Sequence, residues 1–419
     1  MTIKSTLKLS AAMAIGLSAP AFADNNAALL QQNDAGNTAL VTQSGSDNTA
    51  GGNGLALTQS GTTASAGYND LDILQSGDGN AIGLTGTGVT QTSNRTNASN
   101  DADITQSSDD NVIGQVTQTT RGPSSVGAND LDIVQQTGDA NTIQTVIQNR
   151  EARQVNSLAI TMSGSDSNIT LARQSGPNFR GQGTNTLTID MSGSDNGNGT
   201  FTGFAGLSGA TAAEFVQGTS RFGTNASLGS SADIDISGTG NNVGTFQRGL
   251  DNTVGTLDVS GADNQLGVQQ SGNGNTIAVA AVTGTGNNIG VLQVGLTNAG
   301  SVTVAGDRNQ IGLGQAGVSN DATITVTGDD NGLDNPFTGD AAQAGFLSGL
   351  FVQAGTDNAI TFDATGNLNA FAVSQLGYDN SSTGTVTGDS NQFAVLQIGS
   401  SNTAVATQAG NGNNAGIIQ

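Results

Sequence analysis

The chain has 419 residues with a formal net charge of −22, from 11 basic and 33 acidic side chains, and it contains 62 Gly but no Cys, His or Trp. Such an acidic chain repels nucleic acid and anionic lipid, so neither is expected as a direct partner. Without Cys or His, the usual activated nucleophiles and zinc ligands are missing, so we expect no enzymatic activity and no cofactor or metal.

Residues 1–23 have the pattern of a secretory signal peptide. Lys4 and Lys8 give a positive start, residues 9–17 form a short apolar run, and Ala21-Phe22-Ala23 is a small-x-small cleavage site. The apolar run is too short to cross a bilayer, which argues against a membrane helix. We therefore expect a secreted mature chain that is not inserted in a membrane.

Residues 24–235 carry an interrupted repeat. The phrase Gln-Ser-Gly-x-x-Asn occurs at 43–48 and again at 75–80, and residues 69–75 return in nearly the same form at 129–135. Such repetition is typical of solenoids or arrays, in which one unit cannot bury its apolar face alone. The region is expected to hold repeats with insertions.

In residues 236–331 and 352–419 the repeat becomes regular, with Asn recurring at steps of 11 and one step of 12. Counting from each Asn, positions +2 and +4 are mostly apolar, position +6 is Gln in about every second unit, and position +8 is usually Gly. Alternation of this kind predicts a strand of about seven residues, and Gly with Asn favours a tight turn. The sequence thus predicts an all-β fold, a β-solenoid with two strands in each coil of about 22 residues.

The parity of the repeat places polar amides inside the coil. A buried, unpaired amide costs a few kcal/mol, about 2–7 by transfer estimates, whereas amides stacked in register can bond to one another as in cross-β fibres. The alternative is that these residues are exposed turn and surface positions. The predicted stacking ladder comprises Gln270, Gln293, Gln315, Gln375, Gln397, Gln408, Asn264, Asn275, Asn309, Asn358, Asn369, Asn391 and Asn402.

Two further features concern assembly. Residues 332–351 break the rhythm and are expected to form an insertion. The last residues resume it: Asn413, Ala415, Ile417 and Gln419 fill positions 0, +2, +4 and +6 of a final strand. Such a strand leaves unpaired N–H and C=O groups, so these four residues are predicted to form a polymerising edge.

Residues 397–408 read Q-I-G-S-S-N-T-A-V-A-T-Q and resemble the curli family, whose motif is Q-x-G-x-x-N-x-A-x-x-x-Q. The resemblance implies an amyloid subunit on the bacterial surface that serves adhesion and biofilm matrix. It also implies self-association into a homopolymer, a nucleator or related curlin-like subunit as partner, and export through an outer-membrane secretion pore. Length and insertions set the chain apart from typical members, so its role as major subunit, nucleator or ancillary adhesin stays open.

Three other functions are compatible with parts of the sequence. A monomeric β-solenoid adhesin would bind a receptor or polysaccharide through its insertions. A calcium-loaded nonapeptide solenoid requires G-G-x-G-x-D strings, and only residues 51–56 come near this pattern, without the Asp. A solenoid hydrolase would need paired acids such as Asp70 with Asp72 or Asp233 with Asp235, but these lie in repeated phrases typical of an exposed strand face.

Overall fold

The fold was obtained as a computed structural model of the chain. The predicted signal peptide, residues 1–23, lies outside the described residues. The structure describes residues 27–419 except 29, 34–38, 52–56, 62–68, 70, 84–87, 94–99, 122–130, 132, 134, 136–137, 152–153, 156, 176–182, 185, 218–230 and 333–334.

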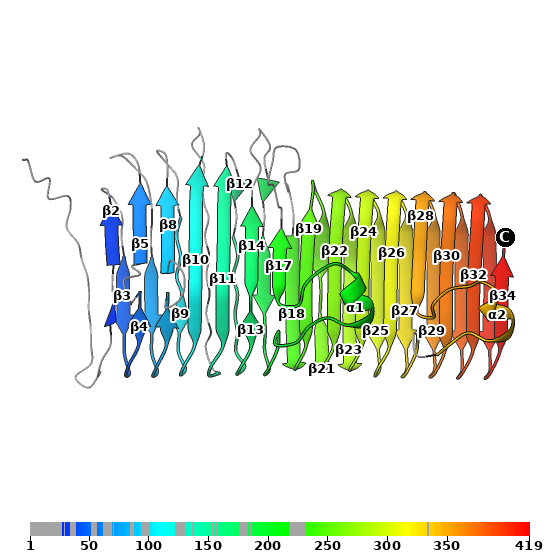
Figure 1. The fold of residues 1–419 in the computed structure, drawn as a ribbon, viewed down its shortest axis with the longest axis horizontal. Helices are drawn as coiled ribbons and strands as arrows, with labels where there is room; N and C mark the ends of the chain where they lie inside the picture. Colours follow the sequence, from blue (N-terminus) through cyan, green and yellow to red (C-terminus); the bar gives the residue numbers. More distant parts are fainter. Residues whose placement is uncertain are drawn as a thin grey trace, which may run out of the picture.

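The chain forms a β-solenoid in which each coil contributes one strand, or rung, to each of two rows (Figure 1). The described strand pairings are parallel, and they join rungs one coil apart. This confirms the predicted fold class. The strands of the first row are β1 (Ala27–Ala28), β2 (Leu30–Asn33), β4 (Thr49–Ala50), β5 (Leu57–Gly61), β7 (Ala81–Ile82), β8 (Gly88–Ser93), β10 (Val112–Arg121), β11 (Thr142–Glu151), β13 (Asn168–Ile169), β14 (Leu171–Ser175), β17 (Glu214–Gln217), β19 (Asn242–Arg248), β22 (Gln265–Asn273), β24 (Asn288–Leu296), β26 (Gln310–Val318), β28 (Leu350–Thr356), β30 (Ala370–Tyr378), β32 (Gln392–Ser400) and β34 (Asn414–Ile418).

The second row runs behind the first in Figure 1. Between β9 and β16 it is continued by Ile133, Gln135 and residues 157–162, which contact the neighbouring rungs through backbone or side-chain atoms. A separate pair, β12 (Gln154–Val155) and β15 (Gly183–Thr184), lies beside the rows. The strands of the second row are β3 (Leu40–Gln43), β6 (Asp72–Gln75), β9 (Thr105–Gln106), β16 (Leu187–Asp190), β18 (Ser231–Thr239), β20 (Thr253–Thr256), β21 (Val259–Ala262), β23 (Thr276–Thr285), β25 (Ala299–Ala305), β27 (Asp321–Thr327), β29 (Ala359–Thr365), β31 (Ser381–Thr387) and β33 (Thr403–Ala409).

Coil length differs between the two halves of the chain. From β19 onward, neighbouring first-row rungs are 22 or 23 residues apart where no insertion intervenes, as predicted; Asn288, for example, pairs with Gln310. In the amino-terminal part the coils are longer, and Gln43 lies 32 residues before its partner Gln75. Fifteen first-row rungs at about 4.8 Å give a rod of roughly 70 Å.

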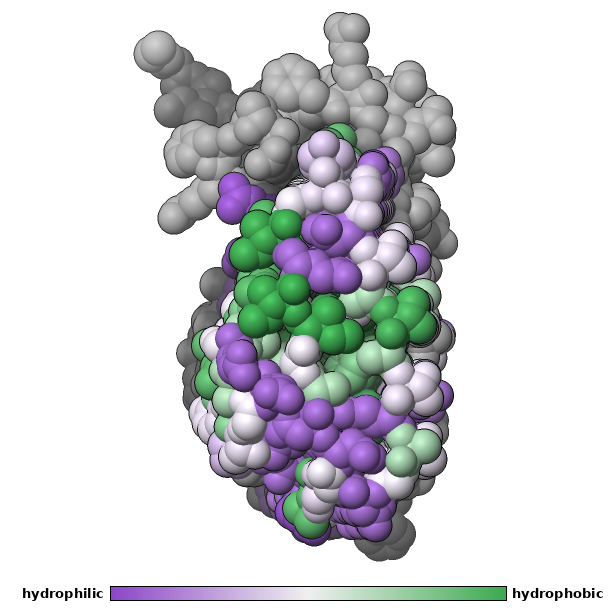
Figure 2. Space-filling model, turned by 90° about the vertical axis from the view of Figure 1, so that its right-hand side faces the viewer, coloured by the Kyte–Doolittle hydropathy of each residue, from purple (hydrophilic) through white to green (hydrophobic). Residues whose placement is uncertain are grey.

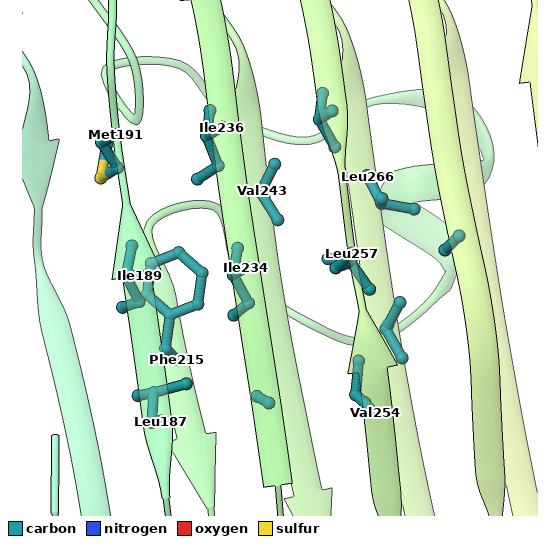
Figure 3. Packing of buried hydrophobic residues seen from close by; sticks show 14 of the residues in the cluster. Leu187, Ile189, Met191, Phe215, Ile234, Ile236, Val243, Val254, Leu257 and Leu266 are labelled. Carbon is teal, nitrogen blue, oxygen red and sulfur yellow. The ribbon is translucent and has the colours of Figure 1, made fainter. Parts of the chain in front are cut away.

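The core lies between the two rows and follows the period of two that a strand imposes. Leu187 and Ile189 of β16 point inward beside Ile234 of β18 and face Phe215 of β17 (Figure 3). Near the carboxyl end, four inward Phe rings stack with centroids 4.8 to 5.7 Å apart, namely Phe351, Phe362, Phe371 and Phe393. The rungs are therefore held by one continuous apolar interior.

Tight turns close the coils, and Gly is required where they stack. Gly317 has φ +124° and pairs in register with Gly355 of the next coil. A Cβ built on Gly317 would lie 1.9 Å from the carbonyl oxygen of Gly355, so no side chain fits. The Gly at position +8 thus serves both the left-handed backbone conformation and the close spacing of coils.

Two insertions fold back onto the outer face of the first row as short helical clips (Figure 1). The first clip contains α1 (Gly203–Leu207), and the second contains α2 (Gly339–Ala342). The expected insertion at 332–351 is too long at both ends. Gly332 still pairs with Gln310, and the strand resumes at Leu350, so only residues 333–348 leave the rung.

Candidate functional site

Glutamine side chains form an unbroken ladder along the first row. Each amide Nε2 donates to the Oε1 of the next coil at 2.7 to 3.4 Å, and the members between the two end residues are buried. The ladder therefore supplies each buried amide with the partner that an apolar core would deny it. Its fifteen members are Gln32, Gln59, Gln91, Gln118, Gln148, Gln174, Gln217, Gln247, Gln270, Gln293, Gln315, Gln353, Gln375, Gln397 and Gln419.

Gln408 does not belong to this ladder, which corrects the sequence prediction. It lies on β33 in the second row, directly above Val386, and a valine side chain offers no hydrogen bond. Its Nε2 instead donates to the carbonyl oxygen of Gln392 at 2.8 Å. Gln408 is only 7% exposed, and its Oε1 has no hydrogen-bond partner.

The second row has a short glutamine ladder of its own, at the amino-terminal end of the solenoid. Gln43 donates to Gln75, Gln75 to Gln106 and Gln106 to Gln135, at 2.8 to 3.1 Å. The Nε2 of Gln135 then meets the sulfur of Met162, where the column changes from amides to apolar side chains. From β18 onward this column is aliphatic: Ile236, Val259, Val282, Val304, Val326, Ala364 and Val386.

Asparagines form two further ladders, one in each turn of the coil. The first turn directly precedes a first-row strand, and the second turn directly precedes a second-row strand. The backbone N–H of each Asn donates to the Oδ1 of the Asn one coil earlier; for Asn264 and Asn241 this distance is 3.1 Å. The first-turn column contains Asn241, Asn264, Asn287, Asn309, Asn331, Asn369, Asn391 and Asn413. The second-turn column contains Asn252, Asn275, Asn298, Asn320, Asn358, Asn380 and Asn402.

The Asn side-chain amides also tie each turn to the next coil. Nδ2 of Asn298 donates to Oδ1 of Asn275 at 2.9 Å and to the carbonyl oxygen of Gly317 at 3.2 Å. Asn369 and Asn391 differ, because their Nδ2 atoms are buried without a partner, and they join the column only through their backbone N–H groups and their Oδ1 atoms. The first-turn column is therefore less completely bonded near the carboxyl end than the second.

Acidic residues occupy the tips of the first-turn loops, where Asp307, Asp329 and Asp389 are half-buried, and they also stack. The backbone N–H of Asp307 donates to Oδ1 of Asp329, and that of Asp329 donates to Oδ1 of Asn367. Asp389 and Asn411 continue the same column. Asp307 and Asp329 are direct neighbours in this column, whereas Asn367 separates the carboxylates of Asp329 and Asp389, which limits repulsion between those two.

The two clips dock on this polar framework in the same way. In the first clip, the backbone N–H of Thr202 donates to Gln265 and that of Ala205 donates to Asn288. In the second, Thr338 and Ala341 make the equivalent bonds to Gln392 and Asn414. Small residues in the first-row strands make room beneath the helices: Gly267, Gly290 and Gly312 under α1, and Ala394 and Gly416 under α2.

The last rungs of the described chain have one open edge. β33 pairs with β31 and β34 pairs with β32, and no described strand follows them. Figure 2 looks onto this end and shows hydrophobic side chains gathered across its middle between hydrophilic ones. The inward residues predicted to form the polymerising edge are half-buried or exposed here, whereas those one coil earlier are covered; this set is Asn413, Ala415, Ile417 and Gln419, above Asn391, Phe393, Val395 and Gln397.

Several ladder members escaped the sequence analysis. Gln353 was missed because the second clip displaces it from the 11-residue step, and Gln247 because it precedes the regular asparagine train. The amino-terminal glutamines recur at separations from 26 to 43 residues, so no fixed period identifies them. A search for Gln that ends each alternating apolar segment, at any spacing, would have found them.

Comparison with protein-family models finds no match for this chain, and comparison with curated proteins finds none either. No helix in the described part of the chain is long and apolar enough to be a membrane span. The ladders and the open edge are therefore the features of this chain that bear on its function.

Proposed function

We propose that the chain is a structural subunit of a secreted, curli-like amyloid fibre, which polymerises by end-to-end β-stacking and supports cell adhesion and biofilm matrix. The observation that carries the proposal is the glutamine ladder, which runs without a break to an edge where its last member, Gln419, is exposed. A second copy offers the same donors and acceptors at the same spacing. In-register stacking of like rungs is the architecture of cross-β fibres.

Energetics favour such growth at the open edge. Ala415 and Ile417 are half-buried on β34, whereas Phe393 and Val395 one coil earlier are 1% and 0% exposed. A docked rung would cover these side chains, at about 25 cal/mol for each Å² of apolar surface removed from water. It would also pair the free backbone groups of β33 and β34, which template strand addition.

The acidic turn tips give the unassembled subunit its solubility. Asp307, Asp329 and Asp389 carry charge on the loops, whereas the inward faces of the rungs are uncharged. Repulsion between turn tips slows premature association without weakening the interior. In this proposal a nucleator or related curlin-like subunit starts the fibre, and export uses an outer-membrane secretion pore.

The adhesin alternative places binding in the insertions. Both clips are docked on the first row, with Phe204 and Ala341 buried, and they expose Leu207 and Leu347. Removal of residues 333–348 separates the two functions, because an adhesin would lose binding whereas a fibre subunit would still polymerise.

Incubation of the purified secreted protein at neutral pH tests the proposal. We expect a Thioflavin T signal that is accelerated by preformed fibres, together with a meridional reflection at about 4.7–4.8 Å in fibre diffraction. Protein that stays monomeric for days, in the presence of seeds as well as in their absence, would refute the fibre function.

A further inference from the structure

The described solenoid begins and ends with a first-row rung, and this sets a geometric condition on any junction between copies. It contains fifteen first-row rungs, from β1 and β2 to β34, and fourteen second-row rungs, from β3 to β33. A copy added in the same orientation would place its first rung on β34 and leave one second-row position empty above β33. A copy turned by half a turn about the rod axis fills every position. The first rung of the added copy then lies on β33 of the first copy, and β3 of the added copy lies on β34 of the first.

The half-turn requires the two rows to be interchangeable at the junction, and the terminal rungs meet this condition. Residues 37–43 read N-T-A-L-V-T-Q and residues 402–408 read N-T-A-V-A-T-Q. Residues 26–32 read N-A-A-L-L-Q-Q and residues 413–419 read N-N-A-G-I-I-Q. All four segments therefore have Asn at position 0, Ala at +2 and Gln at +6. Internal rungs more often carry larger residues at +2, such as Ile289, Ile311, Phe371 and Phe393.

Gln408 offers this junction a donor. Seven consecutive rungs from β18 to β31 place an aliphatic side chain in its column, and Val386 lies directly beneath it. In the ladders Nε2 donates to the next coil and Oε1 accepts from the coil before, so the Oε1 of Gln408 stays unpaired above Val386, which has no donor. Its Nε2 donates to the carbonyl oxygen of Gln392, and a Gln on the open side would supply the second acceptor that Nε2 finds in the ladders.

We infer that successive copies stack with a half-turn about the rod axis, so that Gln408 donates to Gln32 of the next copy and Gln419 donates to Gln43. This inference rests on the proposed fibre function and specifies the partner surface. The long first-row ladder then continues into the short second-row ladder of the next copy, and Gln408 begins the next long ladder. Rung follows rung through the junction in the alternating order found within the chain.

Disulfide trapping distinguishes the two orientations, and the absence of native Cys makes its result unambiguous. Ile418 and Gln31 are exposed and Thr42 is half-buried, and all three occupy position +5, which points outward. In the half-turn junction, residue 418 lies next to residue 42 of the next copy. In the same-orientation junction it lies next to residue 31. Neighbouring rungs of one row are about 4.8 Å apart, which suits a disulfide, whereas outward positions on opposite rows point away from each other on the two faces of the rod.

The experiment mixes the Ile418→Cys variant with either Thr42→Cys or Gln31→Cys before polymerisation, and the fibres are then oxidised. The half-turn junction predicts disulfide-linked dimers with Thr42→Cys and none with Gln31→Cys, and each variant alone provides the background. The reverse result, or fibres that give no dimer in either mixture, would overturn the half-turn. Failure of all mixtures and of the wild-type chain to form fibres would instead count against the proposed function itself.

A second measurement addresses Gln408 directly. Gln408→Leu removes the unpaired amide oxygen, so the melting temperature of the monomer should not fall. Elongation of seeded fibres should nevertheless slow by about fivefold, since one hydrogen bond of about 1 kcal/mol is lost at the junction. Unchanged elongation in this variant would contradict the role assigned to Gln408.

Discussion

Gln315 and Gln353 are 38 residues apart, yet their side-chain amides form a hydrogen bond of 2.8 Å, close to the 2.7 Å bond that joins Gln293 and Gln315, which are 22 residues apart. The sixteen additional residues, 333–348, leave the rung after Gly332 and return at Gly349, two consecutive positions of one strand. The polar ladder therefore fixes the register across an insertion, and the insertion itself is a separable part.

Deletion of residues 333–348 should preserve the solenoid. Joining Gly332 to Gly349 restores the 22-residue step between Gln315 and its partner, while the loss of α2 uncovers only small residues such as Ala394. We expect an unchanged β-sheet circular dichroism spectrum and a melting temperature within about 5 °C of wild type. Deletion of sixteen residues from the rungs themselves, 370–385, which removes β30 and most of β31, should abolish cooperative unfolding. Equal damage from both deletions would show that the clip is required for the register.

Gln293→Ala should destabilise the folded chain by about 2–4 kcal/mol, because it leaves the Nε2 of Gln270 and the Oε1 of Gln315 without ladder partners. Val294, the next residue on the same strand, is 43% exposed and points outward. Val294→Ala is therefore the matched control and should cost less than 1 kcal/mol. Denaturant unfolding of the monomer measures both, and similar losses would mean that the amides do not hold the coils together.

Gly314 and Gly317, two of the three glycines of β26, should respond very differently to substitution by Ala. Gly317 has φ +124° and a Cβ on it would lie 1.9 Å from the carbonyl oxygen of Gly355, whereas a Cβ on Gly314 would meet no atom within 4 Å. We expect Gly317→Ala to prevent a native fold and Gly314→Ala to leave the melting temperature nearly unchanged. Thermal unfolding followed by circular dichroism decides this, and tolerance of Gly317→Ala would exclude the tight stacking of turns.

Asn288→Ala should release the first clip without unfolding the solenoid. Its side chain accepts from the backbone N–H of Ala205 and donates to the carbonyl oxygen of Thr202, and these two bonds hold α1 on the sheet together with the bond from Thr202 to Gln265. Limited proteolysis should then cut within residues 198–212 at least tenfold faster, while the core stays protected. The control is Thr361→Ala, an exposed position away from both clips. Protection of the segment in Asn288→Ala would mean that other contacts suffice to hold it.

The ion pair between Arg308 and Asp330 is bidentate but exposed, so it should matter little. The Arg308 guanidinium, through its hydrogen bonds to the carboxylate, lowers the pKa of Asp330. A lowered folded-state pKa stabilises the fold above the unfolded-state value, and that contribution is lost as the pH falls through the folded-state pKa. Arg308→Ala should therefore lower the melting temperature slightly at pH 7 and not at all near pH 2. A larger difference at the acidic pH would contradict this assignment.

The regular carboxyl-terminal half could be predicted from sequence because each signal there is local. The alternation of Ile289 and Val291, followed by Gln293 and a Gly turn, specifies a rung without reference to any other part of the chain. Gln408 was misassigned because a local phrase does not reveal which row a rung joins. Its motif is the same as that of Gln397, and only the residue stacked beneath, Val386, separates the two.

The docking of the clips could not be predicted from local sequence, for a related reason. Asn288 contacts Ala205 across 83 positions of sequence, and nothing near either residue indicates the other. The irregular amino-terminal coils pose the same difficulty, since Gln43 and Gln75 are brought together by stacking across residues of variable number. Contacts between coils are recognisable in advance only where the coils have equal length.

A ladder in which every member donates upward and accepts from below has no preferred length. A coil such as 288–309 offers its neighbours the same groups on both sides, so its duplication or loss would leave the flanking bonds able to form again. Whole coils can therefore be added to the gene or lost from it with little cost to the stability of the protein where the flanking coils meet. Rod length is thus open to adjustment in steps of about 4.8 Å, independently of the chemistry at the two ends.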